Sequence, residues 1–462
     1  MSRLKKLEEL FSRYSDLSQE AIVKEELLTH GLSWERELKV DDVRGLLRLE
    51  GEPYSLRRTI IRVNKQHDSP YRIESNGEHL KVVDREGGDI VALAHPFPQD
   101  SAYQSAMFAD GTPYSAVVSP DAQVSPVGFG NEVHDPAKVA DAVAEIFVKK
   151  QRPPQEMPSC ILLGGKTVLD SMDQQEEAEF FLQYVDAIRG RIGHQVPILL
   201  EMSPMPVEIE KRIHRHGVEA RLSNPGVWNQ QLFALLCPGE NKKIGWEEWV
   251  RRLLDQVYVY GWNAALPRFA VGLEMAETSG FKSSDEALAS TSEGIRFLMM
   301  HGVVPNLIHW RAELTAALAG LRQPATEFFL EVDRVWYDAW VKYGQDEPIG
   351  YLMGPGRSRY PDSGVYDIGR GGPLSRMQRT RWKRCKMLEA LGEIPYQDCN
   401  GKYRRVRELV EGHATEPPKQ NHIYGVLFKH GGRCDCTVDR NIVRAPDKLS
   451  LVEAEIKRIV QA

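Results

Sequence analysis

The chain has 462 residues, of which 42% are hydrophobic and 27% charged, and its formal net charge is −6. This length can hold one large core with appendages or two to three domains, and the composition is that of a globular protein. The charge excludes a global basic field, and no apolar run reaches the ~18 residues of a membrane span, so we expect neither a nucleic-acid nor a membrane partner. Six scattered cysteines favour a reducing compartment over a disulfide scaffold. We therefore expect a cytoplasmic protein with a small-molecule substrate.

Residues 1–104 are predicted to form an N-terminal α+β lead-in domain. Helices are expected over residues 4–14 and over "SQEAIVKEELLTHG". The stretch "YRIESNGEHLKVVDREGGDIVAL" follows, in which "NG" and "GG" are typical of hairpin turns between short strands.

Residues 105–345 alternate between short apolar strands and amphipathic helices. The predicted strands are "YSAVVS", "SCILLGG", "VPILLEMS", "VEARLS", "PRFAVGLE" and "VVPNLIHW", and a helical segment follows each. Strands that are apolar on both faces indicate a parallel sheet covered by helices. Six units in series predict an α/β fold with a partial (β/α)6 TIM-like barrel, with a doubly wound sheet as the alternative. In either fold, ligands bind at the carboxyl ends of the strands.

Polar residues and glycines follow several of these strands. They are Gly164, Gly165 and Lys166 after the second strand, Glu201 and Ser203 after the third, Asn224 after the fourth, Gly272 and Glu274 after the fifth, and Asn306 and Leu307 in the sixth. Glycines let a ligand approach the backbone, and carboxylates accept hydrogen bonds from ribose hydroxyls or from an ammonium group. The set predicts a site for a zwitterionic nucleoside, although each feature alone is also found in ordinary turns.

The order of several segments resembles the radical S-adenosylmethionine (radical SAM) superfamily, in the branch near biotin synthase. The segments are "LLGGKT", "LLEMSP", "ARLSNPGVWNQQLFALLCPGE", "GWEEWVRRLLDQVYVYGWNAALPRFAVGLE" and "GVVPNLIHWR". The resemblance implies that Gly164 and Gly165 hold the methionine amine of SAM. It also implies that Glu201 or Ser203 meets the ribose, that Gly272 and Glu274 lie along the adenine, and that Asn306 and Leu307 flank it.

One part of the superfamily's pattern is missing. Its members carry a CxxxCxxC loop after the first strand, which binds a [4Fe-4S] cluster through three thiolates. Here "SPDAQVSPVGFGNEVHDPAKVADAVAEIF" (119–147) contains no cysteine, and Asp121, Asn131 and His134 do not replace three thiolates. We therefore expect a degenerate member with no [4Fe-4S] cluster in its barrel and no radical chemistry.

Two functions are compatible with this pattern. In the first, the protein is an enzyme that uses SAM in polar chemistry, such as group transfer or elimination, because a sulfonium is already activated and positioning with a base can suffice. His134 and Glu274 are the candidate catalytic residues, although a loop histidine is also commonly just solvated. In the second, the chain is a catalytically silent relative that serves as a partner or substrate-binding subunit. Either a homo-oligomer or a complex with a partner enzyme is compatible with the sequence.

Residues 346–462 are predicted to form a C-terminal extension that is rich in glycine and basic residues. In "FKHGGRCDCTVDR", His430, Cys434 and Cys436 lie close together, and Cys399 precedes them. These residue types suit a tetrahedral zinc site. Because CxC departs from the usual C-x₂-C spacing, free thiols in a hairpin are the alternative.

Overall fold

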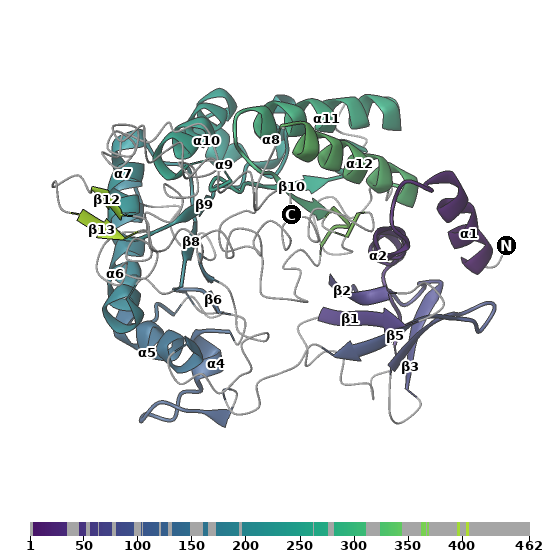
Figure 1. The fold of residues 1–462 in the computed structure, drawn as a ribbon, viewed down its shortest axis with the longest axis horizontal. Helices are drawn as coiled ribbons and strands as arrows, with labels where there is room; N and C mark the ends of the chain where they lie inside the picture. The colour runs from purple at the N-terminus through teal and green to yellow at the C-terminus, as the bar shows by residue number, and fades with distance from the viewer. Residues whose placement is uncertain are drawn as a thin grey trace.

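The computed structural model describes part of the chain. The described residues are 3–34, 46–51, 56–62, 64–75, 80–96, 103, 105–119, 122–127, 132–147, 160–164, 172–193, 196–261, 263–275, 281–310, 324–343, 362–365, 367–368, 395–397 and 403–405. Within them the chain is mixed α/β, with an antiparallel sheet near the N-terminus and a parallel sheet with its helices further along (Figure 1). No helix of these residues has the length and apolar character that a bilayer span requires.

The N-terminal region combines two helices with a five-stranded antiparallel sheet of order β2-β1-β5-β4-β3. Its elements are α1 (Arg3–Arg13), α2 (Gln19–His30), β1 (Leu46–Gly51), β2 (Leu56–Arg62), β3 (Tyr71–Ser75), β4 (Leu80–Asp84) and β5 (Ile90–Pro96). The two helices and the β3-β4 and β4-β5 hairpins confirm the sequence prediction. The pair β1-β2 was not predicted, because its strands carry several arginines and lack clean alternation.

The second region is built on parallel strands in chain order. Four of them form the sheet β6-β7-β8-β9, and two form β10-β11. They are β6 (Gln123–Val124), β7 (Ile161–Leu163), β8 (Ile198–Glu201), β9 (Ala220–Leu222), β10 (Arg268–Val271) and β11 (Asn306–His309). Parallel bridges at Arg221↔Ala265 and Gly226↔Phe269 join the two parts. The strands therefore follow one another along a single curved arc, and no closed barrel is formed by the described residues (Figure 1).

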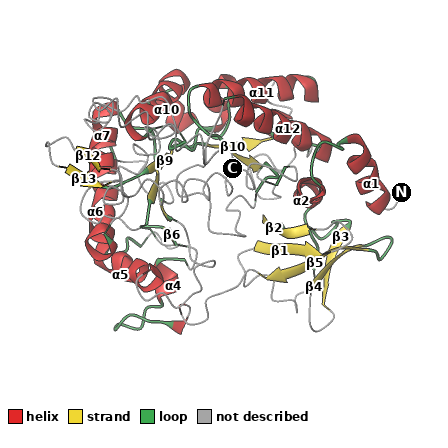
Figure 2. Cartoon of the chain, in the orientation of Figure 1, coloured by secondary structure: helices red, strands yellow, loops and turns green. Residues whose placement is uncertain are grey.

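Helices line the outside of this arc (Figure 2). They are α5 (Pro136–Phe147), α6 (Gln174–Ile192), α7 (Val207–Arg215), α8 (Gln230–Leu236), α9 (Pro238–Lys243), α10 (Trp246–Tyr260), α11 (Ser284–Met300) and α12 (Thr326–Lys342). A capping box of Asp173 and Glu176 fixes the start of α6, because each side chain accepts a hydrogen bond from the other's backbone N–H. One large apolar core joins the sheet to these helices.

The predicted first strand, "YSAVVS", is wrong. Tyr114–Val117 form a single helical turn, α4, and the strand beside β7 is β6, a few residues later. The run is apolar because Val117 and Val118 are buried against the core that includes α5. Periodicity cannot distinguish a short buried strand from a buried helical turn.

Little of the C-terminal extension is described. Residues 362–365 and 367–368 lie against both the N-terminal region and the second region, since Val365 belongs to the core of the latter and Ile368 to the core of the former. A short antiparallel pair, β12 (Pro395–Gln397) and β13 (Tyr403–Arg405), follows. The predicted zinc ligands Cys399, His430, Cys434 and Cys436 lie outside the described residues.

Candidate functional site

Three polar side chains meet where β8 and β9 end and β10 begins, and we call them the inner triad: Glu201, Asn224 and Arg268. Nη1 of Arg268 lies 3.0 Å from Oε1 and 3.1 Å from Oε2 of Glu201. Nδ2 of Asn224 donates to Oε1 of Glu201 at 2.6 Å, and Oδ1 of Asn224 accepts from the backbone N–H of Arg268 at 2.9 Å. Asn224 therefore holds both members of the ion pair in place.

The register of the strands places the inner triad on the face of the sheet away from the helices. Arg221 pairs in register with Leu200, and its guanidinium contacts Glu210 of α7, so it points outward. Side chains alternate along a strand, so the next residue of β8, Glu201, points to the opposite, inner face. Arg268 reaches Glu201 and therefore lies on that inner face as well.

The inner triad is partly open. The side chains of Glu201 and Arg268 each keep 27% of their surface exposed. A carboxylate accepts hydrogen bonds only, and a guanidinium donates only. Beside the carboxyl end of β8, the pair thus offers both kinds of partner to a polar ligand.

Gly164 contacts the triad through its backbone. A Cβ atom at this position would lie 2.5 Å from Cβ and 2.9 Å from the backbone oxygen of Glu201, so only glycine lets β8 approach this closely. Its N–H donates to Val124 of β6 at 3.0 Å. The structure thus explains this glycine by strand packing, while Gly165 and Lys166 lie outside the described residues.

The two predicted residues of β11 point in opposite directions. Asn306 pairs in register with Arg268 and so shares the inner face, where it is buried. Its Nδ2 donates to the backbone oxygen of Leu266 at 3.3 Å, and its Oδ1 has no hydrogen-bond partner among the described residues. Leu307 is buried on the outer face, where it lines a small cavity against α11.

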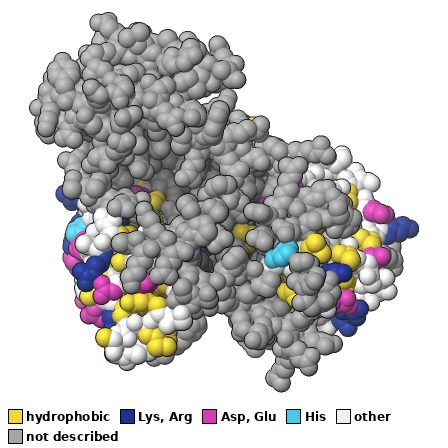
Figure 3. Space-filling view, turned by 60° about the horizontal axis from the view of Figure 1, so that its bottom comes forward, with side chains coloured by type: hydrophobic (Ala, Val, Ile, Leu, Met, Phe, Trp, Pro, Cys, Tyr) yellow, Lys and Arg dark blue, Asp and Glu magenta, His cyan; other side chains and the backbone are white. Residues whose placement is uncertain are grey.

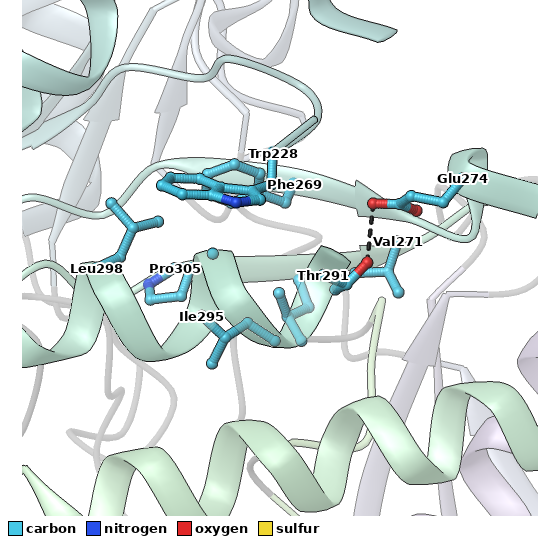
Figure 4. Close-up of a pocket in the computed structure, with 10 residues that line it drawn as sticks. Trp228, Phe269, Val271, Glu274, Thr291, Ile295, Leu298 and Pro305 are labelled. Atoms are coloured by element: carbon cyan, nitrogen blue, oxygen red, sulfur yellow. Dashed lines mark hydrogen bonds between the residues drawn. The ribbon is translucent and has the colours of Figure 1, made fainter. Parts of the chain in front are cut away.

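Glu274 lines that same outer cavity (Figure 4), and the inner triad is not part of the cavity's lining. It accepts hydrogen bonds from Thr291 Oγ1 at 2.8 Å and from the Gly272 N–H at 3.2 Å, and burial raises the pKa of its carboxyl. The cavity measures about 10 Å³, which is space for one water at most. Gly272 has φ +103°, a conformation that favours glycine.

The remaining predicted residues lie apart from the inner triad. The backbone oxygen of Ser203 accepts from Arg221 Nη2 at 2.9 Å on the outer face, and hydrogen bonds from Ser203 reach Glu177 of α6. The backbone of His134 contacts α6, where its oxygen accepts from the Tyr184 hydroxyl at 2.6 Å. The structure therefore brings together Gly164, Glu201, Asn224 and Asn306 from the predicted set.

The loop between β6 and α5 has no thiolate that could bind an iron–sulfur cluster. It runs from the end of β6 at Val124 to the start of α5 at Pro136 and contains no cysteine. Of the cysteines whose surroundings are described, Cys160 is buried at the amino end of β7, and Cys237 follows α8, where burial raises the pKa of its thiol to about 11. In the described ranges, no group of three or more His, Cys, Asp and Glu side chains is arranged to hold a metal ion.

Sequence reasoning missed Arg268, although a signal was present. In "PRFAVGLE" it is a charged residue between apolar neighbours within a predicted strand. A buried or half-buried arginine in such a strand requires an anionic partner. Comparison with family models and with curated proteins finds no match for this chain.

The described surface carries both signs of charge. On the face shown in Figure 3, Lys and Arg side chains lie among Asp and Glu side chains over the described residues. Exposed ion pairs such as Arg251–Glu248 and Arg191–Asp141 contribute to this mixture.

Proposed function

We propose that the parallel sheet is a partial (β/α)6 barrel of the radical SAM type and that its inner face binds SAM or a related nucleoside. The inner triad is the observation that carries the proposal. SAM carries an ammonium group, a carboxylate and two ribose hydroxyls, and all of these are partners for a half-exposed carboxylate and guanidinium. Asn306 adds a buried acceptor on the same face.

We further propose that SAM is used here in polar chemistry, as a substrate for group transfer or elimination. The cysteine-free loop after β6 supports this, because the radical route requires thiolate ligands for the cluster. Glu274 is not part of this proposal, since it lies between the sheet and α11. The residues of the inner face bind and orient the ligand, and the sulfonium itself supplies the activated leaving group.

Calorimetric titration of the full chain with SAM and with S-adenosylhomocysteine tests the binding step. Glu201→Gln removes the charge that Arg268 and the ligand share, so we expect an affinity loss of roughly ten- to hundredfold, the value of a charge-assisted hydrogen bond. Glu248→Gln is the matched control, because it breaks a surface pair with Arg251 and leaves the inner face intact.

Two results would contradict the proposal. Wild-type protein that binds neither ligand would reject the nucleoside site and favour the catalytically silent partner. Equal affinity of wild type and Glu201→Gln would place the site elsewhere.

Iron and sulfide analysis of anaerobically purified protein tests the cluster-free chemistry separately. We expect no barrel cluster, and no 5′-deoxyadenosine from SAM and a strong reductant. A [4Fe-4S] chromophore that remained after replacement of Cys385, Cys399, Cys434 and Cys436 by serine would overturn this part alone.

A further inference from the structure

A second polar cluster joins the N-terminal region to the parallel sheet, and we call it the seam. Three successive charged residues of α2 are buried in it: Lys24, Glu25 and Glu26. Helix α2 is buried on all sides, so these side chains cannot reach water and must find partners in other elements. Each of them contacts a different part of the chain.

Glu25 is at the centre of the seam. Its Oε2 lies 2.7 Å from Nδ1 of His309, the last residue of β11, and both side chains are 1% exposed. Its Oε1 accepts from the backbone N–H of Gly364. The ring of His309 stacks on Phe329 of α12 with 3.3 Å between ring centroids.

The two neighbours of Glu25 in α2, Lys24 and Glu26, contact other elements of the chain. Lys24 Nζ lies 2.7 Å from Oδ2 of Asp367. Glu26 accepts from Thr326 at 2.5 Å and from Tyr71 at 3.0 Å, and Nε2 of His30 lies 3.3 Å from it. Helix α2 thus holds β3, α12 and the segment 362–368 together.

The segment 362–368 also covers the free edge of β11. The backbone N–H of His309 donates to the backbone oxygen of Asp362 at 2.8 Å, and Asp362 pairs with Arg62 of β2 at 2.5 Å. An uncovered edge strand would leave backbone groups open to pairing with other chains. The seam therefore covers one backbone donor on this edge of β11, the N–H of His309.

Asp333 of α12 brings a second carboxyl to Glu25. A Cβ atom on Gly364 would lie 2.5 Å from Oδ2 of Asp333 and 3.1 Å from Oε1 of Glu25, so both carboxyls lie beside the same glycine. Oδ2 of Asp333 is buried and has no hydrogen-bond partner among the described residues. Two adjacent buried carboxyl groups avoid the repulsion of two carboxylates only when one of them holds a proton.

We propose that the Glu25–Asp333 pair is a pH-sensitive latch that holds α2 and the segment 362–368 on β11. When the pair loses its proton, two adjacent buried carboxylates repel each other and the seam loosens. This inference is independent of the ligand proposed for the inner face.

The charged groups around Asp333 determine the direction of the effect. Burial and the Glu25 carboxylate raise the pKa of Asp333 well above its usual range, Asp367 adds to this, and Lys24 opposes it. His309 lies on the far side of Glu25. A carboxyl whose folded pKa exceeds its unfolded value stabilises the fold fully at low pH, and this stability is lost as pH rises toward the folded pKa. The contacts of the latch are therefore most stable at low pH and weaken as the pH rises.

Hydrogen exchange of the full chain, corrected for intrinsic rates, tests the latch in peptides that cover α2 and residues 362–368. Between about pH 5.5 and about pH 8.5 we expect protection in wild type to fall, by no more than about a thousandfold, since one ionisation changes an opening constant by at most about tenfold per pH unit. Asp333→Asn keeps the shape and cannot ionise, so its protection should change less with pH than that of wild type.

Asp338→Asn is the matched control, because Asp338 is exposed on the same helix and should behave as wild type. Glu25→Gln removes the neighbouring charge and should weaken the pH dependence even if Asp333→Asn folds poorly. Wild-type protection that does not change between the two pH values would overturn the latch, as would a pH dependence in Asp333→Asn equal to that of wild type.

Discussion

Two arginine–glutamate pairs lie on opposite faces of the parallel sheet, and they differ in burial. Arg221 and Glu210 on the outer face are fully buried, whereas Arg268 and Glu201 on the inner face are each 27% exposed. Tyr260 and Gln256 each donate a further hydrogen bond to the Glu210 carboxylate of the outer pair. The comparison shows how one sheet separates a fully buried ion pair from one that stays partly exposed.

The outer pair should show the largest effect on stability. Glu210→Gln leaves the Arg221 guanidinium buried without its counter-charge, which costs about 3–5 kcal/mol. Chemical denaturation monitored by circular dichroism measures this loss. A loss below about 1 kcal/mol would mean that the outer pair is not the structural one.

Gly164→Ala should have an intermediate effect, because the added methyl group meets Cβ and the backbone of Glu201. Overpacking of this kind costs about 1–3 kcal/mol. Gly190→Ala is the control, since a Cβ atom at Gly190 of α6 has no neighbour within 4 Å. If both variants unfold at the same denaturant concentration, the close approach of β7 and β8 is not needed for stability.

The inner pair should show the smallest effect on stability. Glu201→Gln removes a partly exposed ion pair, which is worth about 0–1 kcal/mol. Its unfolding midpoint should therefore stay near that of wild type, while affinity for the proposed nucleoside ligand falls. A destabilisation as large as that of Glu210→Gln would remove the distinction between the two faces.

Much of the architecture followed from local patterns in the sequence. Alternation of short apolar strands with amphipathic helices predicted five of the six parallel strands, and "NG" and "GG" predicted the N-terminal hairpins. These signals are local, because periodicity and turn residues depend on neighbours in the chain. The first strand was misplaced because α4 is equally apolar.

The sequence by itself determined that polar residues would follow the strands, because composition at strand ends is visible in one dimension. Only the tertiary structure decided which of them meet. The strand register places four of them on the inner face: Glu201, Asn224, Arg268 and Asn306. Glu274 and Leu307 lie on the outer face, buried beneath α11. The sequence did not predict the seam either, because Glu25 and His309 are 284 residues apart in the chain and Asp333 is further still. Side-chain direction depends on pairing between distant strands, and the pKa of a buried carboxyl depends on neighbours that only folding brings together.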